Sequence, residues 1–324
     1  MEITAAEAVV RLLEEEEVEV VFGYPGGAIL PLYDALYGKK IKHVLVRQEQ
    51  GAAHAANGYA RATGKVGVCI ATSGPGATNL VTGIANAYGD SIPMVIITGQ
   101  VHTQLVGSDA FQEVDITGIT IPITKHNYLV KKAQDLPKIV KQAFLIASTG
   151  RPGPVLIDIP KDVLETVITC SNPKDVRPQG YKPTYKGNTK QIIQAAKAIL
   201  TAERPLIFAG GGIIASGASE ELLTLAETIQ APVVNTLMSI GSFPRSHPLS
   251  LGMLGLHGAK FTNQAVTECD VLIGLGVRFD DRATGKVSGF APNAKIIHVD
   301  IDPAEIGKNV RFDIPIVGDV RVVI

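Results

Sequence analysis

The sequence has few cysteines, and the three that it has, Cys69, Cys170 and Cys269, stand far apart. It contains no C-x-x-C pair, and the odd number does not suit a disulfide framework. A small secreted protein held together by disulfide bonds is therefore excluded. We interpret each cysteine as a buried thiol of a protein in a reducing compartment.

Long apolar runs and an excess of charge are also lacking. Apolar runs such as 93–98 are strand-length, whereas a membrane span needs about 20 residues. The 30 basic and 31 acidic residues give a net charge of −1, which indicates no nucleic-acid partner and no membrane partner. The acidic run 14–17 has the wrong sign for a signal or transit segment. We expect a globular, cytoplasmic protein.

Length and hydrophobic patterning predict two domains. The 324 residues exceed one typical core of about 150 residues. Runs rich in Val and Ile alternate with stretches of helical length, which is typical of a parallel sheet covered by helices. In the first half, the predicted strands are 19–22, 42–46, 67–72, 94–98 and 154–158. The predicted helices there are 5–13, 52–63, 78–88 and 136–148.

The second half begins a new alternation after a segment rich in proline. Pro173, Pro178 and Pro183 lie among Lys, Asn and Gly without apolar periodicity, which indicates a linker. The strands predicted beyond it are 205–209, 232–235, 271–275, 295–300 and 314–317, with helices at 191–201 and 219–229. The predicted fold class is α/β, with two doubly wound parallel-sheet domains at 1–170 and 188–324 and a linker at 171–187.

Glu49 stands in R-Q-E-Q-G-A-A-H-A-A, after the predicted strand 42–46 and at the start of an alanine-rich helix. Open α/β sheets bind ligands where strand ends meet helix starts. The helix dipole alone also favours a carboxylate there, by roughly 0.5 kcal/mol. The small residues Gly51, Ala52 and Ala53 would let a ligand or a neighbouring helix approach closely. Position alone leaves a catalytic and a structural role open for Glu49.

Two glycine-rich turns follow other strands of the first half. They are F-G-Y-P-G-G-A at 22–28 and T-S-G-P-G-A-T-N at 72–79. Gly74 and Gly76 permit backbone conformations closed to other residues. The turns contain neither G-x-G-x-x-G nor a Walker lysine, so a phosphate cradle and a plain tight turn both stay open.

The second half contains a pattern that favours a nucleotide site. F-A-G-G-G-I-I-A places Gly210, Gly212 and Ala215 in the G-x-G-x-x-A spacing of a dinucleotide fingerprint. G-L-G-V-R-F-D-D-R at 274–282 adds two arginines that could pair with phosphates, and I-I-H-V-D-I-D at 296–302 ends in acidic residues that could bind ribose. Structural arginine–aspartate pairs are the alternative. The seven histidines are scattered, and no spacing indicates a metal site or a Ser-His-Asp triad.

Together these strings resemble the large, catalytic subunit of acetohydroxyacid synthase (acetolactate synthase), a thiamine-diphosphate enzyme family. The resemblance runs from about Thr4 to Val323, in the family's order. E-Q-G-A-A-H-A-A alone indicates only the broader superfamily. D-A-F-Q-E at 109–113 and G-V-R-F-D-D-R at 276–282 narrow the resemblance to this synthase.

The resemblance implies that the first domain binds the pyrimidine of thiamine diphosphate and that the Rossmann-like central domain binds FAD. Glu49 would hydrogen-bond the pyrimidine nitrogen, as a catalytic residue in a pocket that excludes water. The residues implied to line that pocket or lie near the reacting centre are Gly27, Pro75, Asn79, Phe111, Gln112 and Lys125, of which Gln112 and Lys125 are further catalytic candidates. The implied FAD-binding residues are Arg151, Gly210, Gly211, Gly212, Thr236, Leu237, Met238, Leu254, Gly255, Leu256, His257, Gly276, Arg278, Arg282, Asp300, Ile301 and Asp319.

The implied reaction is decarboxylation of pyruvate and transfer of the two-carbon unit to pyruvate or 2-ketobutyrate, in branched-chain amino-acid biosynthesis. FAD would be structural, because the reaction has no net redox change. The implied assembly is a homodimer or larger, with a small regulatory subunit. In the family, a third domain with a G-D-G…N motif binds the diphosphate through Mg²⁺. Because this sequence lacks that motif, we expect the chain alone to be inactive.

Two alternatives remain at this point. One is another carboligase or oxidase of the superfamily, such as glyoxylate carboligase or pyruvate oxidase. Glyoxylate carboligase is expected to carry an apolar residue in place of Glu49, which argues against it. The other is a non-catalytic, nucleotide-binding remnant of the enzyme.

Overall fold

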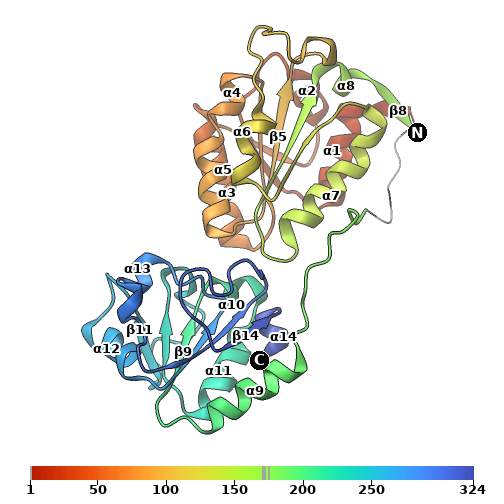
Figure 1. Cartoon of the computed structure of the whole chain (residues 1–324). Coiled ribbons are helices and arrows are strands. Elements are labelled where there is room, and N and C mark those ends of the chain that lie inside the picture. The colour runs from red at the N-terminus through yellow and green to blue at the C-terminus, as the bar shows by residue number, and fades with distance from the viewer. Residues whose placement is uncertain (1, 170–172, 174–175) are drawn as a thin grey trace. The chain divides into compact units, whose positions relative to one another are not determined.

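The computed structural model describes residues 2–169, 173 and 176–324. They form two compact units: unit 1 extends to Tyr181, and unit 2 is Lys182–Ile324. This division falls inside the range 171–187 predicted as a linker. Residues 171, 172, 174 and 175 of that range, and Cys170, lie outside the described residues. Each unit has its own parallel sheet with helices on both faces (Figure 1).

Unit 1 has a sheet of six parallel strands in the order β3-β2-β4-β5-β7-β6. Their bounds are β2 Val20–Gly23, β3 Lys42–Leu45, β4 Gly67–Ala71, β5 Met94–Gln100, β6 His126–Leu129 and β7 Pro154–Pro160. Every residue of β4, β5 and β7 is buried, as expected where helices cover both faces of a parallel sheet. A separate antiparallel pair joins β1 (Glu2–Thr4) to β8 (Val167–Thr169).

The helices of unit 1 lie in two layers. α1 (Ala5–Glu15) and α7 (Leu136–Ser148) pack on one face of the sheet, and α3 (Glu49–Thr63) and α5 (Val81–Asp90) lie on the other (Figure 1). α1 begins with a capping box, in which Thr4 and Glu7 satisfy each other's backbone N–H groups. The short helices are α2 Leu30–Leu36, α4 Pro75–Thr78, α6 Ile116–Thr120 and α8 Lys161–Glu165, with 3-10 turns η1 Thr103–Leu105, η2 Ile121–Ile123 and η3 Ala133–Asp135.

Unit 2 has a second six-stranded parallel sheet, in the order β11-β10-β9-β12-β13-β14. Their bounds are β9 Pro205–Ala209, β10 Val233–Asn235, β11 Ser250–Met253, β12 Val271–Leu275, β13 Lys295–Asp300 and β14 Ile314–Val317. Counted within the unit, this order is 3-2-1-4-5-6, the arrangement of dinucleotide-binding domains, whose crevice opens between the first and fourth strands.

Two apolar clusters cover the faces of the second sheet. α9 (Thr189–Leu200), α10 (Gly211–Ser216), α11 (Ser219–Ile229) and α14 (Val320–Val323) contribute to one of them. α12 (Lys260–Glu268) contributes to the other, which contains Phe208, Phe279 and Phe290 in edge-to-face and tilted contacts. The remaining short elements are η4 Leu237–Ser239, α13 Asp281–Thr284 and η5 Val287–Gly289.

The predicted fold class is confirmed, and every predicted strand is present with ends shifted by a few residues. Two predicted helices differ from the structure. The helix predicted at 52–63 begins at Glu49, because Gln48 has an extended backbone and serves as the N-cap. The helix predicted at 78–88 is divided into α4 and α5, because Pro75 starts a short helix directly after the Gly74 turn. Within the described ranges, no helix is long and apolar enough to cross a bilayer.

Candidate functional site

The carboxyl end of the unit 1 sheet gathers most of the residues expected to bind the pyrimidine. From β2 the chain moves outward to β3 and then crosses to β4 on the other side of β2. Open α/β sheets bind ligands at such a switch point, outside the carboxyl ends of the strands. Turn 22–28 follows β2, Glu49 follows β3, and turn 72–79 follows β4. Gly27, Pro75 and Asn79 therefore come to the same edge as Glu49.

Glu49 is the first residue of α3, where the helix dipole favours a carboxylate. Asn79 Nδ2 donates a hydrogen bond of 2.8 Å to Glu49 Oε2. The other oxygen, Oε1, accepts no hydrogen bond from the residues that the structure describes. A Cβ atom at Gly76 would lie 3.5 Å from Oε1, at ordinary contact distance. The pair therefore leaves one carboxylate oxygen available to a ligand.

The expectation that Glu49 lies in a pocket that excludes water is wrong for this chain. Its side chain is only partly buried, and no strand or helix of unit 1 covers it completely. The physical reason is its position: a residue at the start of a helix and at the rim of a sheet has few neighbours in its own domain. Any exclusion of water requires a surface from outside unit 1.

Backbone contacts hold the two glycine-rich turns and Gln112 together. Gly74 has a φ of +58°, and a Cβ atom there would come within 2.5 Å of the Gln112 carbonyl oxygen. Gln112 itself has a φ of 56°, so both residues adopt the left-handed region where they meet. Ala28 N donates a 3.3 Å hydrogen bond to Thr72 Oγ1, and a Cβ atom at Gly26 would come within 2.5 Å of Thr72 Cγ2. The glycines therefore serve close packing between the turns.

Two residues of this edge, Thr72 and Tyr33, were not predicted. Thr72 belongs to a motif in which only the glycines gave a signal. The Tyr33 hydroxyl is buried against Gly23, where a Cβ atom would lie 2.4 Å from it, and it has no partner among the described residues. Burial, together with the nearby Cys69 and Glu49, raises the pKa of Tyr33, so its phenol stays neutral beside Glu49. No sequence pattern marked Tyr33, because an aromatic residue in a short amphipathic helix is ordinary.

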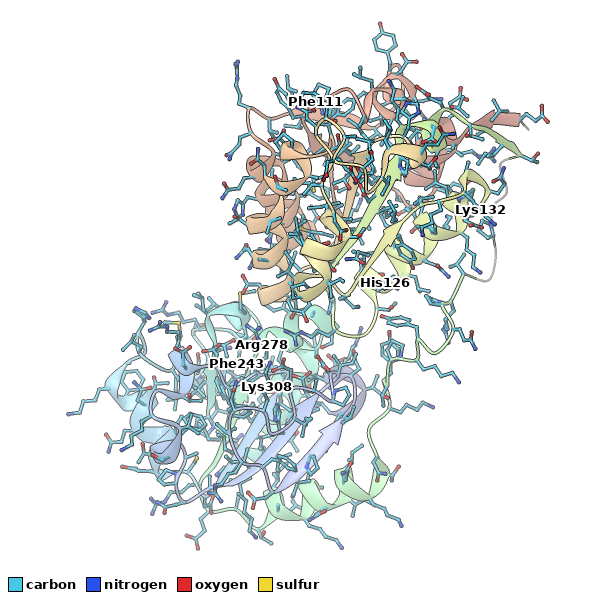
Figure 2. All side chains as sticks on the ribbon, turned by 45° about the horizontal axis from the view of Figure 1, so that its top comes forward. Phe111, His126, Lys132, Phe243, Arg278 and Lys308 are labelled. Carbon is cyan, nitrogen blue, oxygen red and sulfur yellow. The ribbon has the colours of Figure 1, made fainter. Side chains whose placement is uncertain are left out.

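Phe111 lies in the same region as Gln112 and is 86% exposed. An apolar side chain of this size in solvent has no partner in its own domain. Figure 2 shows Phe111 at one end of unit 1 and His126, the first residue of β6, at the other.

The expected position of Lys125 near the reacting centre is contradicted by the structure. Lys125 precedes β6, and its N–H donates a 2.8 Å hydrogen bond to the carbonyl of Pro154, the first residue of β7. It therefore lies at the amino edge of the sheet. At about 3.3 Å per residue, the five residues of β4 separate the two edges by roughly 16 Å. Its ammonium donates to the carbonyls of Ile146 and Thr149, at the end of α7, which is the role of a helix cap.

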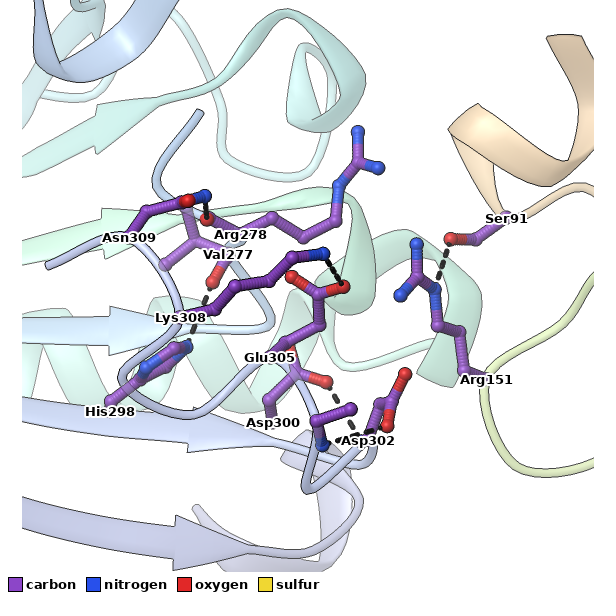
Figure 3. Close-up of polar contacts among 11 residues, drawn as sticks. Ser91, Arg151, Val277, Arg278, His298, Asp300, Asp302, Glu305, Lys308 and Asn309 are labelled. Carbon is purple, nitrogen blue, oxygen red and sulfur yellow. Dashed lines mark hydrogen bonds and ion pairs between the residues drawn. The ribbon is translucent and has the colours of Figure 1, made fainter. Parts of the chain in front are cut away.

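Unit 2 gathers the expected FAD-binding residues at the carboxyl ends of its strands. They follow β9 (Gly210, Gly211, Gly212), β10 (Thr236, Leu237, Met238), β11 (Leu254, Gly255, Leu256, His257), β12 (Gly276, Arg278, Arg282), β13 (Asp300, Ile301) and β14 (Asp319). The strand order thus brings residues from six separate segments to one edge. Arg151 belongs to unit 1 instead, where its Nε donates a 2.8 Å hydrogen bond to Ser91 Oγ (Figure 3).

The glycine fingerprint of unit 2 has a packing role. A Cβ atom at Gly210 would lie 2.0 Å from the Gly276 carbonyl oxygen, and one at Gly212 would lie 2.6 Å from Gly276 Cα. Gly212 N donates a 3.1 Å hydrogen bond to the same carbonyl, and Gly276 has a φ of +58°. The ends of β9 and β12 therefore touch through three glycines, and this contact explains the spacing without a ligand.

The polar groups at this edge differ in how far they are engaged. Asp300 is 7% exposed, and its Oδ1 accepts a 2.9 Å hydrogen bond from Asp302 N (Figure 3). Asp319 caps α14 through hydrogen bonds from Arg321 N and Val322 N. Arg282 contacts Asp281 at 3.7 Å, but both side chains are more than two-thirds exposed, so this pair stabilises the fold little.

A pocket of about 440 Å³ opens beside the same strand ends. It is lined on one side by Leu254, Gly255 and Leu256 and on the other by Arg282 and Phe290. In the described part of the chain, no group of three or more His, Cys, Asp or Glu side chains is arranged to hold a metal ion. Unit 2 thus offers arginines, a buried carboxylate and an apolar pocket.

Comparison with known proteins assigns both units. The thiamine pyrophosphate enzyme N-terminal TPP binding domain matches residues 3–119, and the central domain of the same enzymes matches 192–324. A probable acetolactate synthase large subunit of Methanocaldococcus jannaschii is 61% identical over 98% of this chain and 54% of its own length. An acetolactate synthase large subunit of Mycobacterium tuberculosis is 58% identical over 100% of this chain and 52% of its own length.

An acetolactate synthase large subunit of Corynebacterium glutamicum is 56% identical over 99% of this chain and 52% of its own length. The chain spans about half the length of these curated relatives. The family expected from the sequence motifs is therefore confirmed, and unit 1 is a thiamine pyrophosphate binding domain. The chain belongs to the thiamine pyrophosphate enzymes, of which it holds the N-terminal and central domains, and it is similar throughout to acetolactate synthase large subunits.

Proposed function

We propose that the chain is part of the catalytic subunit of an acetolactate synthase. Such an enzyme decarboxylates pyruvate on thiamine diphosphate and joins the two-carbon unit to pyruvate or 2-ketobutyrate, in branched-chain amino-acid biosynthesis. The observation that carries this proposal is Glu49, held by Asn79 at the switch point of a TPP binding domain with one oxygen available. The identity of about 60% to acetolactate synthase large subunits supports the choice of reaction.

The residues of unit 1 fit the pyrimidine half of thiamine diphosphate. Oε1 of Glu49 would accept a hydrogen bond from a ring nitrogen and hold or return a proton there, while Asn79 fixes Oε2. The neutral phenol of Tyr33 lies behind this carboxylate without competing for a proton. Pro75, Gly27 and Gln112 would line the ring, and the bound cofactor supplies the electron sink for decarboxylation.

We propose FAD as the ligand of unit 2. Arg278 and Arg282 would pair with its phosphates, and Asp300 at the end of β13 would bind ribose hydroxyls. The order of the strands and the buried position of the Asp300 carboxylate support this fit. Arg151 would contribute from unit 1. The isoalloxazine would be structural, because acetolactate formation transfers no net electrons.

The remainder of the enzyme would come from protein outside this chain. We propose that Mg²⁺ and the cofactor's diphosphate bind there, so that this chain alone is inactive. The exposed Phe111 and the incompletely covered Glu49 favour a homodimer or larger assembly, in which another surface closes the site. Relatives named large subunits support a small regulatory subunit as a partner, and we propose a cytoplasmic location.

The proposal is tested by Glu49→Gln in a protein that joins this chain to the rest of an acetolactate synthase large subunit. General acid–base contributions are typically 100-fold or more, so we expect acetolactate formation from pyruvate to fall by about 100-fold or more. The matched control is Glu220→Gln, the same change in the first turn of α11, which should leave the rate unchanged. An unchanged rate in Glu49→Gln would refute the role of Glu49. Bleaching of bound flavin by pyruvate would instead indicate a pyruvate oxidase.

A further inference from the structure

The segment that carries Phe111 and Gln112 is ordered without an apolar core of its own. It runs from Val101 to Val114, between β5 and α6, and we refer to it as the 101–114 loop. None of its residues is buried, and Leu105, Val106 and Phe111 are exposed. Apolar packing therefore does not fix this loop. Its backbone N–H groups are instead bound by carboxylates.

Glu113 organises the middle of the 101–114 loop. Its carboxylate accepts hydrogen bonds from Gly107 N, from Ser108 N at 3.2 Å and from Ala110 N at 3.1 Å. These bonds, the one from Gly107 first, hold the pKa of Glu113 below its usual range. Hydrogen bonds to a charged acceptor are about twice as strong as neutral ones. One carboxylate thus closes the turn immediately before Phe111.

Asp162, in the first turn of α8, fixes the beginning of the loop. Its carboxylate accepts hydrogen bonds from Thr103 N at 2.9 Å and from Thr103 Oγ1 at 2.5 Å. Thr103 is the first residue of η1, so this pair sets the direction in which the chain leaves β5.

Asp158, buried in β7, acts on both ends of the loop through Gln100. Asp158 Oδ2 accepts a 2.9 Å hydrogen bond from Gln100 Nε2, and the same nitrogen donates at 2.9 Å to the carbonyl of Val114. Gln100 Oε1 accepts a 2.9 Å hydrogen bond from Val101 N. The carboxylate therefore decides which end of the Gln100 amide faces each end of the loop.

We propose that Glu113, Asp162 and Asp158 are positioning residues that hold the 101–114 loop in one conformation before any ligand binds. The loop then keeps Gln112 against Gly74 and presents Phe111 at the edge where Glu49 lies. A preformed loop spares a ligand the entropy cost of ordering it. Use of the loop by a ligand at Glu49 rests on the proposed function, whereas its ordering by the carboxylates does not.

The test is amide hydrogen exchange of this chain, measured by NMR without ligand. A glutamine at 113 keeps one acceptor oxygen and turns an NH₂ group toward the other donors. In Glu113→Gln, exchange at Gly107, Ser108 and Ala110 should therefore accelerate by on the order of tenfold or more. The nuclear Overhauser contact between Gly74 and Gln112 should also be lost. Asp109→Asn is the matched control: it lies in the same loop, has a φ of 57° that asparagine tolerates, and should change neither result.

The other two carboxylates have their own reporter amides. Asp162→Asn should accelerate exchange at Thr103, and Asp158→Asn should accelerate it at Val101. Unchanged exchange at the reporter amides would overturn the proposal. Equal acceleration in the core strands β4 and β5 would also overturn it, because the carboxylates would then only stabilise unit 1 as a whole.

A second measurement separates this inference from the proposed function. In the joined protein, Glu113→Gln should lower kcat for acetolactate formation by about tenfold, and Asp109→Asn should not. If the joined protein formed no acetolactate while the exchange results held, the proposed function would fail and the ordering of the loop would stand. Unchanged kcat in an active Glu113→Gln protein would show that the loop does not serve the site.

Discussion

At the scale of residues, glycine motifs marked the right places for a different reason from the one expected. Gly74 permits contact with Gln112, and Gly210 and Gly212 permit contact with Gly276. In each case backbone meets backbone at the ends of neighbouring strands. Such motifs therefore report the close approach of two turns, and a ligand is a further step that only the surrounding charged groups support.

Substitution of Gly210 tests this packing role. A Cβ atom there would lie 2.0 Å from the Gly276 carbonyl oxygen, which is backbone of an adjoining strand end and cannot turn away. Gly210→Ala should lower the free energy of unfolding of unit 2 by about 2 kcal/mol or more, as overpacking does. Gly289→Ala is the control, since a Cβ atom added there would meet nothing within 4 Å, and its effect should stay within about 0.5 kcal/mol. Calorimetry compares the two, and equal unfolding temperatures would contradict the packing role.

Asp158 predicts a dependence of stability on pH. Burial, opposed by hydrogen bonds from Thr98 and Gln100 and assisted by the charge of Asp115, raises the pKa of Asp158 to about 7. The unfolded value is about 3.9. The folded state thus binds the proton more tightly, so the contribution of Asp158 is fully present below about pH 4 and is lost as pH rises to about 7.

The measurement is the free energy of unfolding of unit 1 in the wild type and in Asp158→Asn. The difference, wild type minus variant, should fall between about pH 4 and pH 7 and stay level above that range. The variant removes only the titration of residue 158, so other carboxylates cancel in the difference. A difference that is constant with pH would show that Asp158 is ionised throughout.

At the scale of elements, the sequence predicted the central strands and missed two strands at sheet edges. β4, β5, β7, β9 and β12 are almost entirely buried, so each is a continuous apolar run. β6 and β11 lie at sheet edges and contain no buried residue, so they have no such run.

The missed strand β6 also explains why Lys125 was placed wrongly. A residue that follows a strand of a parallel sheet lies at its carboxyl edge, and one that precedes a strand lies at the opposite edge. Glu49 and Asn79 follow predicted strands, which gave their edge correctly. Lys125 precedes a strand that was not predicted, so its motif alone could not show that it lies away from Glu49.

At the scale of the whole molecule, two cores account for the two units. The apolar cluster of unit 1 contains residues from Ala5 to Ile168 only, and the clusters of unit 2 contain residues from Ala195 to Val320 only. Length and the proline-rich segment were enough to predict this division. The partners of the exposed Phe111 and the half-buried Glu49 were not predictable, because they depend on surfaces outside unit 1.

Separate cores predict that each unit folds alone. Both sizes fall in the usual range of domains, about 50 to 250 residues, and each sheet is complete within its unit. Residues 2–181 and 182–324, expressed separately, should each unfold cooperatively in calorimetry, at the temperatures of the corresponding transitions of the whole chain. Division after Gln230 is the control, because it separates β9 from β10 and should abolish folding of the second piece. If the intact 182–324 piece were also unfolded, unit 2 would depend on unit 1 for stability, and the carboxyl edge of its sheet could not be treated as a preformed site.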